Sequence, residues 1–301
     1  MKKEARNRLE RKINDHCKVD KKNSFKISDH DTDWRNMEDL KKLGERSLKK
    51  KAKKMIDDNL KELSEAQELL YASNKYSMLL VFQAMDAAGK DGTIKHVMSG
   101  VNPQGCEVHS FKKPSAEESA HNYLWRYTTK MPVKGQIGIF NRSYYEEVLV
   151  LKVNPELVHD AEPDEGYWEG RYEDINDLEK YLNKNGTIVL KFFLNVSKDE
   201  QKTRFLERTN SPEKHWKFSD SDLVERAKWN SYQKAFEDAI NATATEHTPW
   251  WVIPADNKWI MRTIVSTIVT DTITRLKLEA PKVSEEKKKM IDAARAELEA
   301  E

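Results

Sequence analysis

The fold is decided by the stretch MLLVFQAMDAAGKDGTIK, residues 78–95. Its first five residues form a continuous apolar run, which is typical of a strand buried on both faces in a parallel sheet. A loop of small residues follows, and Gly89 and Lys90 precede a helical stretch. This order predicts a phosphate cradle, in which backbone N–H groups and the helix N-terminus face an anion and Lys90 supplies a mobile cation.

The loop departs from the pattern GxxxxGK[ST] at two positions. Ala84 replaces the first Gly, and Asp91 replaces the hydroxyl residue that would normally hold magnesium. Asp86 places a carboxylate inside the loop, where a negative charge beside phosphates requires a metal ion. Because Mg²⁺ prefers carboxylate oxygens, we interpret Asp86 as a magnesium ligand or a water-mediated partner of the ion. The simpler alternative is a strand-to-helix turn in which Asp91 only caps the helix.

Further apolar runs predict the rest of the sheet. Three core strands are expected at 137–140, 188–194 and 250–253, and a weaker strand, nearer an edge, at 106–111. Amphipathic or apolar helices are expected at 43–71 and 258–278. Strands separated by helical crossovers indicate an α/β fold, a three-layer α/β/α domain with a central parallel sheet whose ligands lie beyond the carboxyl ends of the strands.

Composition changes along the chain predict its organisation. Residues 1–42 are polar and are expected to form an extended arm, and residues 43–278 form the main domain. Within that domain, about 198–238 is rich in charge and is interpreted as a mobile lid, and the acidic segment 154–176 as an exposed excursion. Residues 279–301 are predicted to be a charged helical tail.

Composition also restricts the class of protein. The 301 residues are 38% hydrophobic and 34% charged, and the formal charge is +1, which is too even for a protein that mainly coats nucleic acid. The two cysteines, Cys17 and Cys106, have no CxxC spacing. No apolar leader or membrane-length apolar run occurs. We therefore expect a soluble cytoplasmic protein that binds neither nucleic acid nor membranes, and its long apolar-striped helices predict a homo-oligomer.

Two other segments carry charges suited to phosphate chemistry. Arg142 follows the 137–140 strand and can neutralise a transferring phosphoryl group, while Glu146 and Glu147 could bind metal or sort nucleotides. The alternative is a helix start with salt-bridged acids. Arg204 and Arg208 lie one helical turn apart on the same face, where their like charges repel each other. A bound polyanion would relieve this repulsion, and the alternative is an ordinary solvated helix face. Further cations that could line a polyphosphate channel are Lys95, Lys112, Lys113 and Arg126.

The chain resembles the polyphosphate kinase 2 family from about residue 43 to residue 276. The resemblance rests on six ordered segments, 85–96, 101–105, 140–143, 191–194, 204–208 and 215–218. It implies a P-loop kinase-like fold with a helical lid, dependence on Mg²⁺ with Mn²⁺ as an alternative, and reversible transfer of the terminal phosphoryl group of polyphosphate to a nucleotide. Residues 144–149 resemble the subgroup that accepts both AMP and ADP, although Glu147 stands where Asp is expected in much of that subgroup.

The resemblance also implies roles for individual residues. Asp86, Lys90 and Arg142 are expected to be catalytic, with Asp86 on the metal. Phosphate and polyphosphate are assigned to Ala87, Ala88, Gly89, Asp91, Gly92, Thr93, Lys95, Arg126, Arg204 and Arg208, and the nucleotide to Asn141, Glu146, Glu147 and Lys217. The expected partners are inorganic polyphosphate and AMP, ADP or ATP, with GMP and GDP as further candidates. An ATP-dependent nucleotide kinase and a non-catalytic polyphosphate or nucleotide sensor remain as alternatives.

Overall fold

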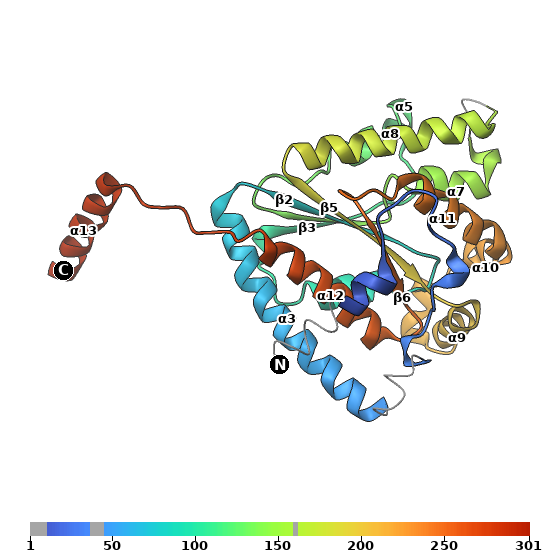
Figure 1. The fold of residues 1–301 in the computed structure, drawn as a ribbon, viewed down its shortest axis with the longest axis horizontal. Coiled ribbons are helices and arrows are strands. Elements are labelled where there is room, and N and C mark those ends of the chain that lie inside the picture. The colour runs from blue at the N-terminus through green and yellow to red at the C-terminus, as the bar shows by residue number, and fades with distance from the viewer. Residues whose placement is uncertain (1–10, 37–44, 159–161) are drawn as a thin grey trace.

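A six-stranded sheet forms the centre of the computed structural model, which describes residues 11–36, 45–158 and 162–301 (Figure 1). The strand order is β1-β6-β5-β2-β4-β3. All neighbours are parallel except β1, which runs antiparallel to β6. The strands are β1 Lys18–Val19, β2 Ser77–Gln83, β3 Cys106–Ser110, β4 Ile137–Asn141, β5 Thr187–Asn195 and β6 Trp250–Pro254.

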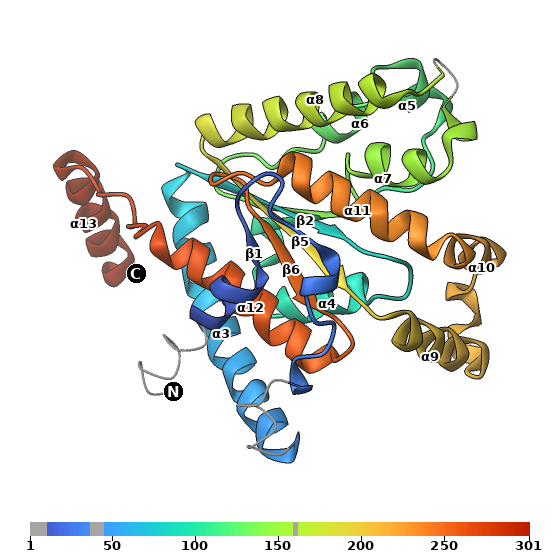
Figure 2. The same cartoon turned by 45° about the vertical axis from the view of Figure 1, so that its right-hand side comes forward.

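Helices cover both faces of the sheet. On one face lie α3 Glu45–Ser73, α4 Lys90–Val97 and α12 Lys258–Arg275, and on the other lie α7 Glu146–Val153, α8 Glu165–Lys184 and α11 Trp229–Thr243 (Figures 1 and 2). Every residue of β2 and β6 is buried, as expected for strands covered on both faces. The three-layer α/β/α fold with its mostly parallel sheet is therefore confirmed.

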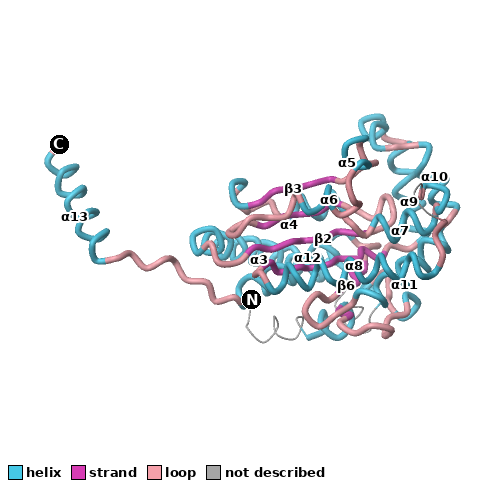
Figure 3. The backbone as a smooth tube through the Cα atoms, turned by 90° about the horizontal axis from the view of Figure 1, so that it is seen from above, coloured by secondary structure: helices cyan, strands magenta, loops and turns pink. Residues whose placement is uncertain are grey.

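Shorter elements surround the carboxyl ends of the strands. The helices there are α5 Ala116–Ala120, α6 Trp125–Thr128, α9 Lys198–Thr209 and α10 Asp220–Ala227. Short 3-10 helices span Ile27–Asp29, Trp34–Asn36, Pro103–Gly105, Pro155–Leu157 and Pro212–Lys217. The last helix, α13 Glu285–Ala300, lies apart from the body of the protein at the end of an extended connection (Figure 3). None of the helices in the described ranges is long and apolar enough to cross a membrane.

Two segments differ from the sequence-based expectation. The described part of the N-terminal segment is folded rather than extended: residues 11–17 are helical, β1 pairs with β6, and Phe25 and Trp34 are buried in the core. Residues 1–10 and 37–42 lie outside the described part. The expected excursion at 154–176 is wrong from Glu165 onward, because α8 begins there and buries Trp168 and Ile175 against the domain.

A charged pair is buried in the core between the sheet and α8. Lys191 on β5 places its Nζ 2.6 Å from Glu179 Oε2, and the two side chains are 0% and 1% exposed. Lys191 also donates to the carbonyl of Thr243 at 2.8 Å. Glu179 accepts hydrogen bonds from the hydroxyls of Tyr144, Tyr145 and Thr248 at 2.8 to 3.0 Å. Every charge in this cluster therefore has several partners, as a buried ion pair requires.

Candidate active site

The loop between β2 and α4 has a backbone shape that few residues adopt. Ala87 has φ +61° and Gly89, the N-cap of α4, has φ +108°. A side chain at positive φ costs about 1–2 kcal/mol, which Gly89 avoids and Ala87 does not. The Lys90 side chain folds back over the loop and donates to the carbonyl of Ala84 at 3.0 Å. The predicted strand-loop-helix cradle is thus present, and its strained turn is held by contacts from elsewhere.

Arg142 joins this loop to the end of β4. Its Nη2 donates to Asp86 Oδ1 at 2.7 Å, and its Nη1 lies 3.6 Å from Glu146 Oε2. Arg142 also has a positive φ, +64°, and its backbone N–H donates to the carbonyl of Phe82. The turn after β4 therefore aims the guanidinium at the loop after β2, which brings Asp86, Lys90 and Arg142 to one place.

These groups line a cavity of about 950 Å³ at the carboxyl ends of the strands. Its walls come from the β2–α4 loop, the ends of β3 and β4, helix α7, and the segment 208–236. Both cations and acids line it: the cations are Lys90, Lys112, Lys113, Arg142, Arg208 and Lys217, and the acids are Asp86, Asp91, Glu146, Asp222 and Glu225. A cavity of this size and charge suits a phosphorylated ligand at the edge where α/β folds bind them.

Most of the residues expected to bind ligands lie on this cavity. From the predicted set these are Asp86, Ala87, Gly89, Lys90, Asp91, Gly92, Asn141, Arg142, Glu146, Arg208 and Lys217. Asn141 and Asp91 also contact each other, because Asn141 Nδ2 donates to Asp91 Oδ1 at 2.8 Å. Residues that follow β2 and β4 and residues of the segment 208–236, up to about 130 positions apart in sequence, thus share one surface.

Six predicted residues do not line the cavity, and two of them are buried arginines. Arg204 is 4% exposed and binds backbone carbonyls. Arg126 is 6% exposed, donates to the carbonyl of Lys112 at 2.8 Å, and lies 5.4 Å from the centre of the Phe111 ring. Both guanidinium groups instead bind carbonyls of segments that line the cavity.

The other four residues are off the cavity because of their burial or the direction of their side chains. Ala88 is buried, and the Thr93 hydroxyl donates to the carbonyl of Gly89. Lys95 is exposed on α4 beyond the cavity. Glu147 points away from Glu146 and accepts a hydrogen bond from the Tyr127 hydroxyl at 3.0 Å. Neighbours on a helix face different directions, so one acid faces the cavity and the next does not.

Sequence reasoning missed the acids and hydroxyls that the segment 208–236 places on the cavity. Asp222 caps α10 together with Ser219 and lies 3.5 Å from Arg208 Nη1. Tyr232 donates its hydroxyl to Glu225 at 2.5 Å. A Ser-x-x-Asp pattern at 219–222 signals the start of this helix, but nothing in the sequence indicates which ligand its exposed end faces.

The surroundings shift the protonation of two cavity groups in opposite senses. Burial lowers the pKa of Lys90 from its ordinary value, and the neighbouring Arg142 lowers it further. Burial raises the pKa of Glu146, and Arg142 and Lys90 oppose that rise. Both shifts arise mainly because burial disfavours the charged form of each group.

The carboxylates on the cavity wall suit a Mg²⁺ ion that takes most of its coordinating oxygens from bound phosphates and water. Within the described residues no group of three or more His, Cys, Asp and Glu side chains is arranged to hold a metal alone. Asp86 lies on the loop with a side chain 28% exposed. Mg²⁺ commonly takes one or two protein carboxylates and completes its shell with water and substrate phosphates. Asp86 is one of the five acids on the cavity wall that could supply such a carboxylate.

Comparison with known proteins agrees with this geometry. The family profile of polyphosphate kinase 2 matches residues 46–281. The ADP-polyphosphate phosphotransferase of Rhodopseudomonas palustris is 48% identical over 250 residues, covering 81% of this chain and 86% of that protein. The AMP/ADP-polyphosphate phosphotransferase of Meiothermus ruber is 46% identical over 231 residues, covering 77% and 84%. The crystal structure of polyphosphate kinase 2 from Arthrobacter aurescens TC1 aligns with a TM-score of 0.85 at 35% identity, covering 96% and 97%.

Proposed function

The chain belongs to the polyphosphate kinase 2 family, and from that premise we propose that it transfers the terminal phosphoryl group of inorganic polyphosphate to AMP and ADP, giving ADP and ATP reversibly. The observation that carries the proposal is the convergence of Asp86, Lys90 and Arg142 on one cavity at the strand ends. The names of the two relatives supply the donor and the acceptors.

In this proposal the protein positions the reactants and neutralises charge, and it forms no covalent intermediate. Lys90 leaves the loop carbonyls that it now contacts and binds the transferring phosphoryl group. Arg142 approaches the same group from β4 with its planar fork. Asp86 would hold Mg²⁺, which would supply neutralisation of the phosphate charge. Asp86 also orients Arg142, because the two side chains already form a 2.7 Å ion pair.

The two substrates are proposed to enter along different walls. Arg208 and Lys217 from the segment 208–236 and Lys112 and Lys113 after β3 supply cations for phosphates. Asn141 and Glu146 lie at the end of β4, where we place the nucleotide. The segment about 198–238 is proposed to act as the lid, since it supplies Arg208, Asp222 and Glu225 to the cavity and no side chain of α10 is buried.

A donor experiment tests the function directly. Purified protein is incubated with AMP or ADP, polyphosphate and Mg²⁺ without ATP, and the products are resolved by chromatography. Formation of ADP from AMP and of ATP from ADP supports the proposal. Product only with ATP as donor would indicate an ATP-dependent nucleotide kinase, and binding without product would indicate a sensor. Replacing AMP and ADP by GMP and GDP measures the range of acceptors, which we propose includes both purines.

Metal dependence is tested on the same reaction. Turnover is expected to vanish with a chelator and to return with Mg²⁺, and with Mn²⁺ as the alternative ion. Asp86→Asn should raise the Mg²⁺ concentration required or abolish transfer, and Lys90→Ala should abolish transfer. Both variants should unfold at close to the wild-type temperature, because neither side chain is part of the apolar core.

We further propose a cytoplasmic homo-oligomer that binds neither nucleic acid nor membranes. The free thiols of Cys17 and Cys106 suit a reducing compartment. Helix α13 exposes Met290, Ile291 and Leu298, an apolar stripe that a second subunit could cover. Light scattering on the full chain and on a chain ending at residue 278 tests this assembly. The mass of a monomer for both chains would refute it.

A further inference from the structure

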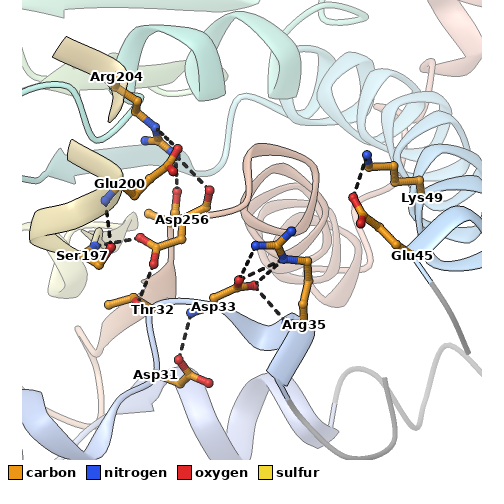
Figure 4. A network of polar contacts seen from close by, with 11 residues as sticks. Asp31, Thr32, Asp33, Arg35, Glu45, Lys49, Ser197, Glu200, Arg204 and Asp256 are labelled. Carbon is orange, nitrogen blue, oxygen red and sulfur yellow. Dashed lines mark hydrogen bonds and ion pairs between the residues drawn. The ribbon is translucent and has the colours of Figure 1, made fainter. Parts of the chain in front are cut away.

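A continuous set of hydrogen bonds links the N-terminal segment to the phosphate loop, and Figure 4 shows its part around Thr32, Asp256 and Arg204. It begins at Thr32, whose hydroxyl donates to Asp256 Oδ2 at 2.7 Å, and whose carbonyl accepts from the Asp256 N–H at 3.0 Å. It continues through Arg204 on α9 and ends at the carbonyls of Ala87 and Ala88. Thr32, Asp256 and Arg204 do not line the cavity themselves, whereas Ala87 at the end of the chain of contacts does.

Every N–H donor of Arg204 is used within the protein. Nη1 donates to the carbonyls of Ala87 at 3.1 Å and Ala88 at 2.6 Å. Nη2 donates to the carbonyls of Ala255 at 2.6 Å and Asp256 at 3.2 Å, and Nε donates to Glu200 at 2.8 Å. A guanidinium has five N–H donors, so none remains for a phosphate. Arg204 therefore acts through the loop that it holds.

The carbonyls that Arg204 binds decide where the loop N–H groups point. A peptide unit is planar and trans, so its N–H points opposite to its carbonyl. With the Ala88 carbonyl fixed on Arg204, the N–H of Gly89 is turned the other way, and Gly89 lines the cavity. The same bonds hold Ala87 at its unfavourable φ of +61°. Arg204 thus keeps a phosphate-binding donor in place before the substrate arrives.

Asp256 fixes Arg204 from two directions. Its Oδ1 accepts the N–H of Ser197 at 2.7 Å, and Ser197 is the N-cap of α9, the helix that carries Arg204. Its backbone carbonyl is one of the four that the guanidinium binds. The Thr32 hydroxyl occupies the other carboxylate oxygen. Movement of Asp256 would therefore shift both the helix and the carbonyls that orient Arg204.

We propose that Asp256 and Thr32 are positioning residues for phosphoryl transfer, which makes the N-terminal segment a working part of the active site. They hold Arg204 against the carbonyls of Ala87 and Ala88, and this contact aims the Gly89 N–H at the phosphate. The inference rests on the function proposed above, and its test is designed so that each can fail separately.

The test compares substitutions that differ in one hydroxyl or one charge. Thr32→Val keeps the shape of the side chain and removes the hydroxyl, Thr32→Ser keeps the hydroxyl, and Asp256→Asn removes the charge. Thr270→Val is the matched control, because Thr270 is buried on α12 and donates to the carbonyl of Asn59, away from the loop. Steady-state rates with ADP, polyphosphate and Mg²⁺ are measured together with the unfolding temperature.

The expected result is a loss of kcat that the control does not show. Thr32→Val should lower kcat about tenfold, the effect of losing one hydrogen bond to a charged group, and Asp256→Asn about a hundredfold, the effect of misplacing a reacting group. KM for ADP should stay within about twofold, Thr32→Ser should restore kcat, and Thr270→Val should keep it. If Thr32→Val and Thr270→Val lose stability alike and both keep kcat, the inference is wrong.

Hydrogen exchange gives a readout that does not depend on the reaction. In Thr32→Val and Asp256→Asn, amides of residues 84–92 should exchange faster than in the wild type, while Thr270→Val leaves them unchanged. Unchanged exchange in this loop in Thr32→Val would overturn the inference even if the wild type makes no ATP from polyphosphate. A wild type that makes no ATP from polyphosphate would by itself refute only the proposed function. If Asp256→Asn does not fold, the two Thr32 variants decide the question.

Discussion

The buried pair of Lys191 and Glu179 makes a quantitative prediction about stability. Lys191→Met would remove the only cation that contacts the Glu179 carboxylate in the described structure, while leaving that carboxylate 1% exposed. Removing one partner of such a pair typically destabilises a protein by about 3–5 kcal/mol. Because the hydroxyls of Tyr144, Tyr145 and Thr248 still donate to Glu179, we expect about 3 kcal/mol for this variant.

The double variant Lys191→Met with Glu179→Gln should be more stable than either single variant. The Gln carbonyl can still accept hydrogen bonds from the surrounding hydroxyls, and no uncompensated charge remains. The main loss is the hydrogen bond from Lys191 to the carbonyl of Thr243. Leaving such a buried carbonyl without a donor costs about 1–3 kcal/mol. We therefore expect the double variant to lose about 1–2 kcal/mol.

Urea unfolding measures these differences. Fluorescence of the eight tryptophans, among them Trp250 with its ring centre 5.3 Å from Lys191 Nζ, follows the transition. Linear extrapolation then gives the free energies of unfolding. Lys184→Met at the exposed end of α8 is the control and should change stability by less than about 0.5 kcal/mol. Single variants that cost under about 1 kcal/mol, or a double variant as costly as their sum, would refute the reasoning.

Three further predictions concern the cavity and its surroundings. Arg208→Ala should raise KM for polyphosphate about tenfold, as loss of a charge-assisted contact does, whereas Lys95→Ala should leave it unchanged; equal effects would contradict the placement of these two cations. Arg142→Lys should lower kcat about a hundredfold, because Lys lacks the planar fork, and a wild-type rate would refute that role. Burial raises the pKa of Glu147 above its ordinary 4.5, so the folded state binds the extra proton and the free energy of unfolding should fall as pH rises from 4.5 through the raised pKa. Glu147→Gln should make this slope shallower while keeping KM for ADP, because the raised pKa of Glu146 leaves part of the slope in place. Thermal melts across that pH range measure the change in slope.

The sheet could be predicted because strands buried on both faces are continuous apolar runs in the sequence. The apolar runs at 78–82, 137–140 and 250–253 correspond to β2, β4 and β6 within one residue at each end. Helix α8 was missed because Gly166, Gly170 and a high content of acids hide the buried Trp168, Tyr172 and Ile175, although their spacing of three and four is helical. The two-residue β1 pairs with a strand more than 200 positions away, which no local pattern can indicate.

The centre of the site could be predicted because its residues lie directly at strand ends. Asp86, Lys90 and Arg142 follow β2 and β4 directly, so the parallel sheet brings them together. Arg204 and Arg208 have the same local sequence signal, yet one is buried with all donors used and the other lines the cavity. That difference is set by the loop after β6 and by Asp256, which meet α9 only in the folded chain.

The transfer of radiolabelled phosphate from polyphosphate to ADP tests the central claim most directly. The measurement compares initial rates for the wild type and Asp86→Asn, with Mg²⁺ present and ATP absent, after equal unfolding temperatures have been verified. We predict label in ATP with the wild type and at most a trace with Asp86→Asn. No label in ATP with the wild type, or an equal rate in the variant, would contradict the claim that a phosphoryl group passes across the cavity where Asp86, Lys90 and Arg142 converge.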